Sequence, residues 1–175
     1  MSGSFKTIIA IVVASLVIAI FPLMAVSERA NDQAQVIAES KVSEFVNNAA
    51  TTGSIKFKNY NSLVSSLAST GNTYNVDIEV ERLGENIGVK AAWIHGDVIG
   101  ENSTYKIYTQ NIEEDLNRVG VFNLNRGDKL TVSVKNNNKT LASNFRSFVY
   151  GISGKRNYDI LADYTATVTK TGGKN

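Results

Sequence analysis

The feature that most constrains the fold of this chain is an apolar segment close to its N-terminus. Residues 8–26 are almost wholly apolar, and only Ser15 interrupts the run with a polar side chain. At about 1.5 Å per residue, a helix of this length spans roughly 30 Å, the thickness of the hydrocarbon core of a bilayer. A helix in the core of a soluble protein would instead show one polar face. The segment therefore predicts a single transmembrane helix.

We expect residues 1–29 to form a membrane anchor with a short cytoplasmic N-terminus. Pro22 would kink the helix or mark its less regular end. The side chains expected to lie in the bilayer are Ile8, Ile9, Ile11, Val12, Val13, Leu16, Val17, Ile18, Ile20, Phe21, Pro22 and Leu23.

The predicted orientation rests on the charges that flank the apolar segment. Lys6 and the terminal amine lie on the short side, whereas Arg29 and Lys41 on the long side are offset by several acids. Acids count little in the positive-inside rule, but a cytoplasmic N-terminus fits best. We therefore expect a single-pass, signal-anchored protein whose domain, residues 30–175, is extracytoplasmic. The alternative is secretion after signal-peptide cleavage, because residues 25–27 are small enough for a signal peptidase.

A helical apolar pattern continues beyond the anchor. Small and apolar side chains recur at spacings of three and four residues, and no Gly or Pro interrupts the run before Gly53. One helix is therefore predicted over residues 5–50. Its second half either covers the sheet of its own domain or packs against neighbouring copies, because small side chains allow close helix approach. The stripe consists of Ala30, Ala34, Ala38, Val42, Phe45 and Ala49.

The rest of the chain predicts short helices and antiparallel strands. Helical segments are expected over 61–68, with Asn61 as its cap, and over 109–117, with Ile112 and Leu116 facing inward. Alternation of apolar and polar residues predicts strands over 74–81, 87–94, 105–108, 130–135, 141–150 and 158–168. We expect residues 130–135 and 141–150 to form a hairpin, and the tail from Lys170 to be frayed. The predicted fold is α+β: an amphipathic helix packed on an antiparallel sheet.

Composition excludes several classes of site. The 175 residues include no Cys and a single His, which removes disulfides, thiolate metal sites and most histidine metal sites. The formal net charge is +2, and the basic residues are scattered among acids, so no nucleic-acid partner is expected. No phosphate-binding glycine loop occurs. We therefore expect no cofactor.

Three further patterns each have an ordinary structural interpretation that we favour. Asp77, Glu79 and Glu81 share one strand face, which is typical of a solvated face rather than of a cation site. His95 lies two residues before Asp97, but no nucleophile motif accompanies this acid–base pair, so catalysis is not expected. Residues 126–128 spell the Arg-Gly-Asp of adhesion proteins, yet Gly-Asp before a strand is an ordinary turn.

The layout resembles that of pilins and pseudopilins and, more narrowly, of the TadE-like small envelope proteins of bacterial pilus and conjugation clusters. The similar stretch is residues 49–80, AATTGSIKFKNYNSLVSSLASTGNTYNVDIEV, where a G-x-I turn precedes a short helix and strands. Type IV pilins are cut after a Gly and carry a Glu at the fifth mature position. Cleavage after Gly3 would place Ile8 there. The N-terminus could be cleaved after Gly3 or after Ser27, and the sequence is compatible with either site.

Two hypotheses about function follow. The resemblance implies a non-catalytic, bitopic envelope protein, a minor or accessory component of a pilus, secretion or conjugation apparatus. Its partners would be the bilayer and other envelope or assembly proteins, including copies of itself. The alternative is a membrane-tethered or secreted binding or adhesion domain that uses one face of the sheet or the loop at residues 126–128.

Overall fold

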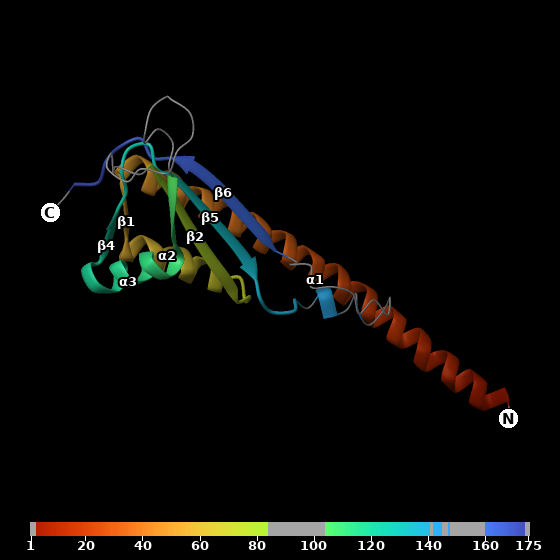
Figure 1. Cartoon of the computed structure of the whole chain (residues 1–175). Helices are drawn as coiled ribbons and strands as arrows, with labels where there is room; N and C mark the ends of the chain where they lie inside the picture. Colours follow the sequence, from red (N-terminus) through yellow and green to blue (C-terminus); the bar gives the residue numbers. More distant parts are fainter. Residues whose placement is uncertain (1–2, 84–103, 141, 145–146, 148–159, 174–175) are drawn as a thin grey trace, which may run out of the picture.

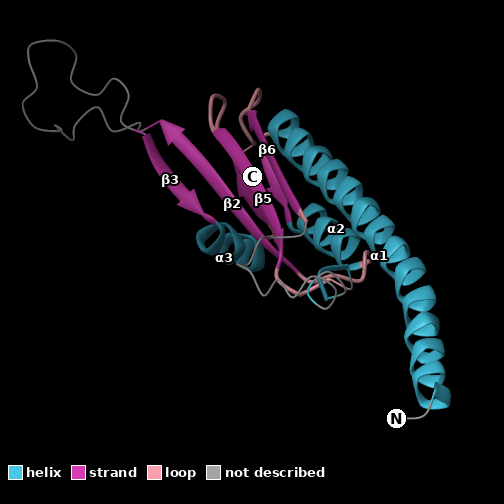
Figure 2. Cartoon of the chain, turned by 90° about the vertical axis from the view of Figure 1, so that its right-hand side faces the viewer, coloured by secondary structure: helices cyan, strands magenta, loops and turns pink. Residues whose placement is uncertain are grey.

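A computed structural model describes residues 3–83, 104–140, 142–144, 147 and 160–173. The chain begins with one long helix, α1 (Gly3–Thr52), which confirms the continuous helix predicted over residues 5–50. The N-terminal half of α1 stands away from the labelled strands and from α2 and α3, and its C-terminal half lies along the strands (Figures 1 and 2). The molecule is therefore a small domain built on one end of a helix.

The domain is α+β, as predicted, and every strand pair among the described residues is antiparallel. The larger sheet has the order β3-β2-β5-β6, and β1 and β4 form a separate pair. The elements after α1 are β1 (Ser54–Lys56), α2 (Phe57–Ala68), β2 (Tyr74–Leu83), β3 (Thr104–Tyr108), α3 (Thr109–Val119), β4 (Val121–Asn123), β5 (Lys129–Asn136) and β6 (Leu161–Thr167).

The alternating patterns in the sequence give the sheet one apolar and one polar face. In β2, Ile78 and Val80 are buried, and in the register with β5 they pair with Val132 and Leu130, which are also buried. The residues between them point to the opposite face, because successive side chains of a strand alternate. There the hydroxyl groups of Thr131 and Thr165 lie 3.0 Å apart.

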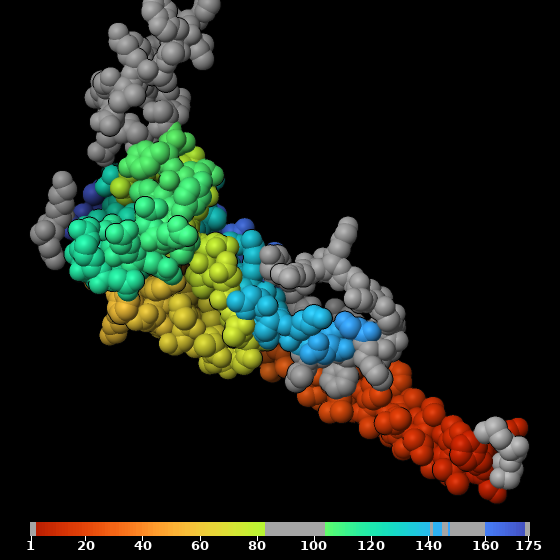
Figure 3. Space-filling view, turned by 60° about the horizontal axis from the view of Figure 1, so that its bottom comes forward, coloured from red at the N-terminus to blue at the C-terminus, as the bar shows by residue number. Residues whose placement is uncertain are grey.

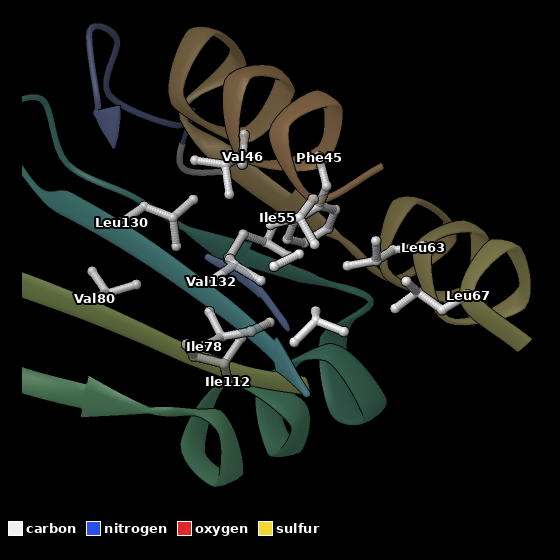
Figure 4. Close-up of a cluster of buried hydrophobic side chains, with 14 of the residues drawn as sticks. Phe45, Val46, Ile55, Leu63, Leu67, Ile78, Val80, Ile112, Leu130 and Val132 are labelled. Atoms are coloured by element: carbon white, nitrogen blue, oxygen red, sulfur yellow. The ribbon is translucent and has the colours of Figure 1, made fainter. Parts of the chain in front are cut away.

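The core lies between the apolar face of the sheet and the three helices. Phe45 and Val46 of α1, Leu63 and Leu67 of α2, and Ile112 of α3 belong to one buried cluster with the strand residues (Figure 4). Ile112 and Leu116 face inward, as predicted. Fully burying one such side chain stabilises the fold by roughly 1.5–3 kcal/mol. This cluster therefore supplies most of the favourable free energy of folding that comes from apolar burial.

Helix α2 begins four residues earlier than predicted, at Phe57 rather than Asn61. The chain passes directly from β1 into the helix, and Lys56 at the N-cap makes no side-chain capping bond. Instead, the backbone N–H of Phe57 donates to the carbonyl of Gly120, 2.9 Å away. The first turn of α2 is thus capped by the backbone carbonyl of Gly120, the residue before β4, instead of by the side chain of Asn61.

The predicted hairpin after β5 is wrong. The neighbours of β5 are β2 and β6, and the described residues 142–144 and 147 are helical rather than extended. Thr140 explains the change, because its hydroxyl accepts the N–H of Ser143 at 3.2 Å and its carbonyl accepts the N–H of Asn144 at 3.0 Å. A threonine in this position starts a helical turn.

The tail is bound to the domain rather than frayed, at least as far as Gly173. The N–H of Gly172 donates to the carbonyl of Leu124 at 2.9 Å, and the N–H of Thr169 donates to that of Ala50 at 3.0 Å. Gly172 also lies directly against the backbone of Gly53, at the end of α1. Only residues without a Cβ permit two backbones to come this close.

The strand predicted over residues 87–94 lies outside the described residues. The strand predicted over 105–108 is confirmed as β3, and the last strand is confirmed as β6, which begins at Leu161 rather than at residue 158.

We expect Gly53→Ala to destabilise the protein far more than Gly71→Ala does. Both glycines have positive φ angles, +73° and +79°, so both substitutions bear the strain of that conformation. A Cβ at Gly53 would lie 2.2 Å from the carbonyl oxygen of Lys170, whereas one at Gly71 would meet nothing within 4 Å. Forcing atoms into filled space costs roughly 1–3 kcal/mol, which should be the difference in unfolding free energy between the two variants.

Urea unfolding of the full chain in detergent, followed by circular dichroism, measures this difference. Equal losses of stability in the two variants would contradict the close contact between Gly53 and the tail.

Candidate functional site

The most distinctive surface of the molecule is the N-terminal half of α1. Its apolar side chains are exposed around the helix, including Ile8, Val17, Ile18 and Phe21. No part of its most apolar window is buried inside the structure, and α1 is the one described helix long and apolar enough to cross a bilayer. Residues 8–26 therefore form an exposed apolar rod, which we call the apolar segment.

The amphipathic stripe that follows is buried in the core of its own chain. Ala34, Ala38, Val42, Phe45 and Ala49 pack against the sheet and are at most 6% exposed. Of the predicted stripe, only Ala30 is exposed. The structure thus supports the first interpretation of the stripe, a cover for its own sheet, and five of these side chains are out of reach of a neighbouring copy.

The outward face of α1 carries its own exposed apolar side chains. Val36 is 64% exposed and Ile37 is 38% exposed, on the side of the helix away from the core. They are single apolar side chains among exposed polar ones, such as Asp32, Gln33 and Ser40. A contact between this helix and another protein would therefore use this face rather than the buried stripe.

The Arg-Gly-Asp sequence forms a turn, as we favoured. Gly127 has a φ of +94°, and the N–H of Asp128 donates to the carbonyl of Asn125 at 3.0 Å. The Asp128 side chain is buried, with 2% of the residue exposed, and it accepts hydrogen bonds from Arg82 Nε and Nη2 at 2.9 and 2.8 Å. This carboxylate is consequently unavailable to an external receptor.

Arg82 joins the turn to the sheet. Its guanidinium lies 5.9 Å from the centre of the Phe122 ring and also donates to the carbonyl of Asn123 at 3.0 Å. Burial alone would lower the pKa of Arg82, but the hydrogen bonds and charge of Asp128 outweigh it and raise the pKa. Arg82 therefore stays charged at any physiological pH, and its contacts hold β2, β4 and the turn before β5 together.

The three acids of β2 lie on the polar face of the sheet. Glu79 forms an ion pair with Lys106 of β3 at 2.8 Å, and Asp77 accepts a hydrogen bond from Asn75 at 3.0 Å. Among the described residues, no group of three or more acidic or histidine side chains is arranged to hold a metal ion. The row is a solvated strand face whose charges are partly paired.

Helices α2 and α3 are joined by a polar contact. The hydroxyl of Tyr60 donates to the carboxylate of Glu113, and burial together with this contact raises the pKa of Tyr60.

A hollow of about 120 Å³ lies between α1 and α2, lined by Lys41, Glu44 and Asn48 among others. Pockets for small organic ligands measure roughly 300–1,000 Å³, so this hollow is sized for water.

Two of the side chains that organise the domain gave no recognisable signal in the sequence. Arg82 was one charged residue among many, and its partner Asp128 was visible only as part of a turn. Gln35 lies off the apolar stripe, yet its side-chain amide donates to the carbonyl of Leu161 at 2.6 Å and accepts the N–H of Leu161 at 3.0 Å. This amide pairs with the start of β6 as another strand would.

His95 and Asp97 lie outside the described residues, so the predicted absence of catalysis at this pair stays a prediction.

Comparison of the chain with protein-family models, with curated proteins and with solved structures found no match.

We expect Asp128→Ala to lower the unfolding free energy by roughly 3–5 kcal/mol, because it leaves the Arg82 charge partly buried without its partner. Arg126→Ala alters the same tripeptide at an exposed side chain and should change stability by less than about 0.5 kcal/mol. Urea denaturation of both variants and of the parent provides the measurement. Similar small effects for both would show that the ion pair does not support the fold.

Proposed function

We propose that this protein is a bitopic envelope protein that acts by association rather than by catalysis. The observation that carries the proposal is the apolar segment, exposed on the same continuous helix whose second half is the central element of the domain. In water this segment would cause aggregation, because it exposes a large contiguous apolar surface. Insertion into a bilayer removes it from water.

The energetics of the apolar segment favour insertion. Its large aliphatic and aromatic residues each contribute roughly 0.3–0.6 kcal/mol near the bilayer centre, or about 3–7 kcal/mol together. The backbone groups of the apolar segment can be satisfied inside α1 except near Pro22, which lies close to the C-terminal end of the segment. In this proposal the N-terminus is cytoplasmic and the domain is extracytoplasmic.

The layout also underlies the proposed role in assembly. The arrangement resembles the plan of TadE-like and pseudopilin-like components. It has an exposed apolar half-helix, a second half of the helix packed on an antiparallel sheet, and a polar outer face of the sheet. We therefore propose a minor or accessory subunit of a pilus, secretion or conjugation apparatus. The alternative adhesion role through residues 126–128 loses its support, because Asp128 is buried.

Two arginines placed within the apolar segment should abolish membrane integration. In the double variant Val13→Arg/Val17→Arg, each arginine costs roughly 2.5–3.5 kcal/mol, which together matches the whole favourable term. The control Val36→Arg/Ile37→Arg adds the same charge to the same helix outside the segment. After alkaline extraction of membranes, we expect the control but not the first variant in the pellet, and retention of both would overturn the proposed anchor.

The proposed orientation is tested on the same cells. Because the chain lacks cysteine, Ser4→Cys and Thr51→Cys each create a single reactive thiol. A membrane-impermeant maleimide should label the second variant in intact cells and the first only after permeabilisation.

Association predicts intermolecular crosslinks on the outward face of α1. Single cysteines at Val36 and Ser40 should yield disulfide-linked dimers in native membranes, whereas a cysteine at Ala38, which is 0% exposed, should not. Adding Ile37→Arg should weaken the crosslink at Ser40 by placing a charge in the contact. A domain that acts alone in the membrane would give no dimer at any of these positions.

A further inference from the structure

A short helical turn packs against α1 immediately after the apolar segment. Val26 is 63% exposed, but Ser27, the next residue, is only 7% exposed. Asn31 Nδ2 donates to Thr140 Oγ1 at 3.0 Å, and Ala142 is completely buried. Residues 142–144 lie beside α1, further toward its N-terminus than the neighbouring ends of β5 and β6 (Figures 1 and 3).

The turn is held in place by the chain before it. The N–H of Asn137 donates to the carbonyl of Thr73 at 2.9 Å, and the side chain of Asn138 accepts the N–H of Thr73 at the same distance. Asn136 Nδ2 donates to the carbonyl of Asn138 at 2.9 Å. The segment that leads from β5 to the turn is thus tied to the sheet, and Thr140 is tied to α1.

The position of the turn along α1 fixes its depth relative to an inserted apolar segment. Asn31 follows Val26 by five residues, which corresponds to roughly 7–8 Å of helix. The polar headgroup region of a bilayer extends about 5–8 Å beyond the hydrocarbon core on each side. A turn bonded to Asn31 therefore lies at the level of the lipid headgroups.

The side chains exposed at this level carry both signs of charge. Arg29 and Lys139 are exposed cations, Asp32 is an exposed anion, and Asn144 adds an exposed amide. Zwitterionic phospholipids present a phosphate and an ammonium group, for which these side chains are complementary hydrogen-bonding and ionic partners.

We propose that the domain rests directly on the membrane surface, with Lys139, residues 142–144 and the adjoining part of α1 seated among zwitterionic phospholipid headgroups. This inference rests on the proposed insertion of the apolar segment. Because α1 continues from that segment into the core without a linker, the contact fixes the tilt of the domain. The far end of α1 and the β1–β4 pair are then directed away from the membrane.

Fluorescence quenching by depth-labelled lipids tests the proposal on the full chain. Single cysteines at Leu16, Asn144 and Thr51 are labelled with an environment-sensitive dye, and each protein is reconstituted into phosphatidylcholine vesicles. These contain lipids with a nitroxide either on the headgroup or within the acyl chain. Thr51 is the matched control, since it is exposed on the same helix roughly 35–40 Å beyond Val26. Lys139→Cys provides a second probe should Asn144→Cys disturb the turn.

Strong quenching of the Asn144 and Lys139 probes by headgroup nitroxides, with little quenching at Thr51, is the expected result. The Leu16 probe should respond most to acyl-chain nitroxides. Quenching at Leu16 combined with Thr51-like behaviour at both turn probes would overturn the headgroup contact and leave insertion intact. Absence of acyl-chain quenching at Leu16 would overturn insertion itself, and the headgroup contact with it.

Discussion

The packing of the second half of α1 on the sheet is the interaction on which the rest of the structure depends. The small side chains Ala34, Ala38 and Ala49 bring the helix close to β5 and β6, and Phe45 fills the space toward α2. A helix buried along one face for its second half cannot swing relative to the domain. The direction in which the apolar segment leaves the domain is therefore set by the packing of the core.

Periodicity in the sequence was sufficient to predict most of this architecture. The three- and four-residue spacing that includes Ala38 and Val42 predicted the helix and its buried face, and the alternation around Ile78 and Val132 predicted the central strands. These signals are strong because each arises from many residues facing the same hydrophobic core. The apolar segment was equally visible, because its apolar side chains form one uninterrupted run, and the described residues of the domain leave it exposed.

Features that depend on one or two contacts distant in sequence could not be predicted. Asp128 is buried because Arg82, 46 residues earlier, reaches it. The tail is ordered because Gly172 meets Gly53, and α2 starts early because Gly120 accepts its first N–H. In each case the local sequence is compatible with several outcomes, and the partner that decides between them becomes visible only once the chain is folded.

The junction between the tail and the end of α1 has a consequence for how the chain is made. Thr169 and Ala50 are separated by 119 positions, yet the backbone of one is bonded to the other. Contacts of such long range form late, since they require nearly the whole intervening chain. During synthesis α1 is made first, and its C-terminal end lacks these contacts until residues 169–172 leave the ribosome. The domain therefore reaches its final packing only after residues 169–172 have been synthesised.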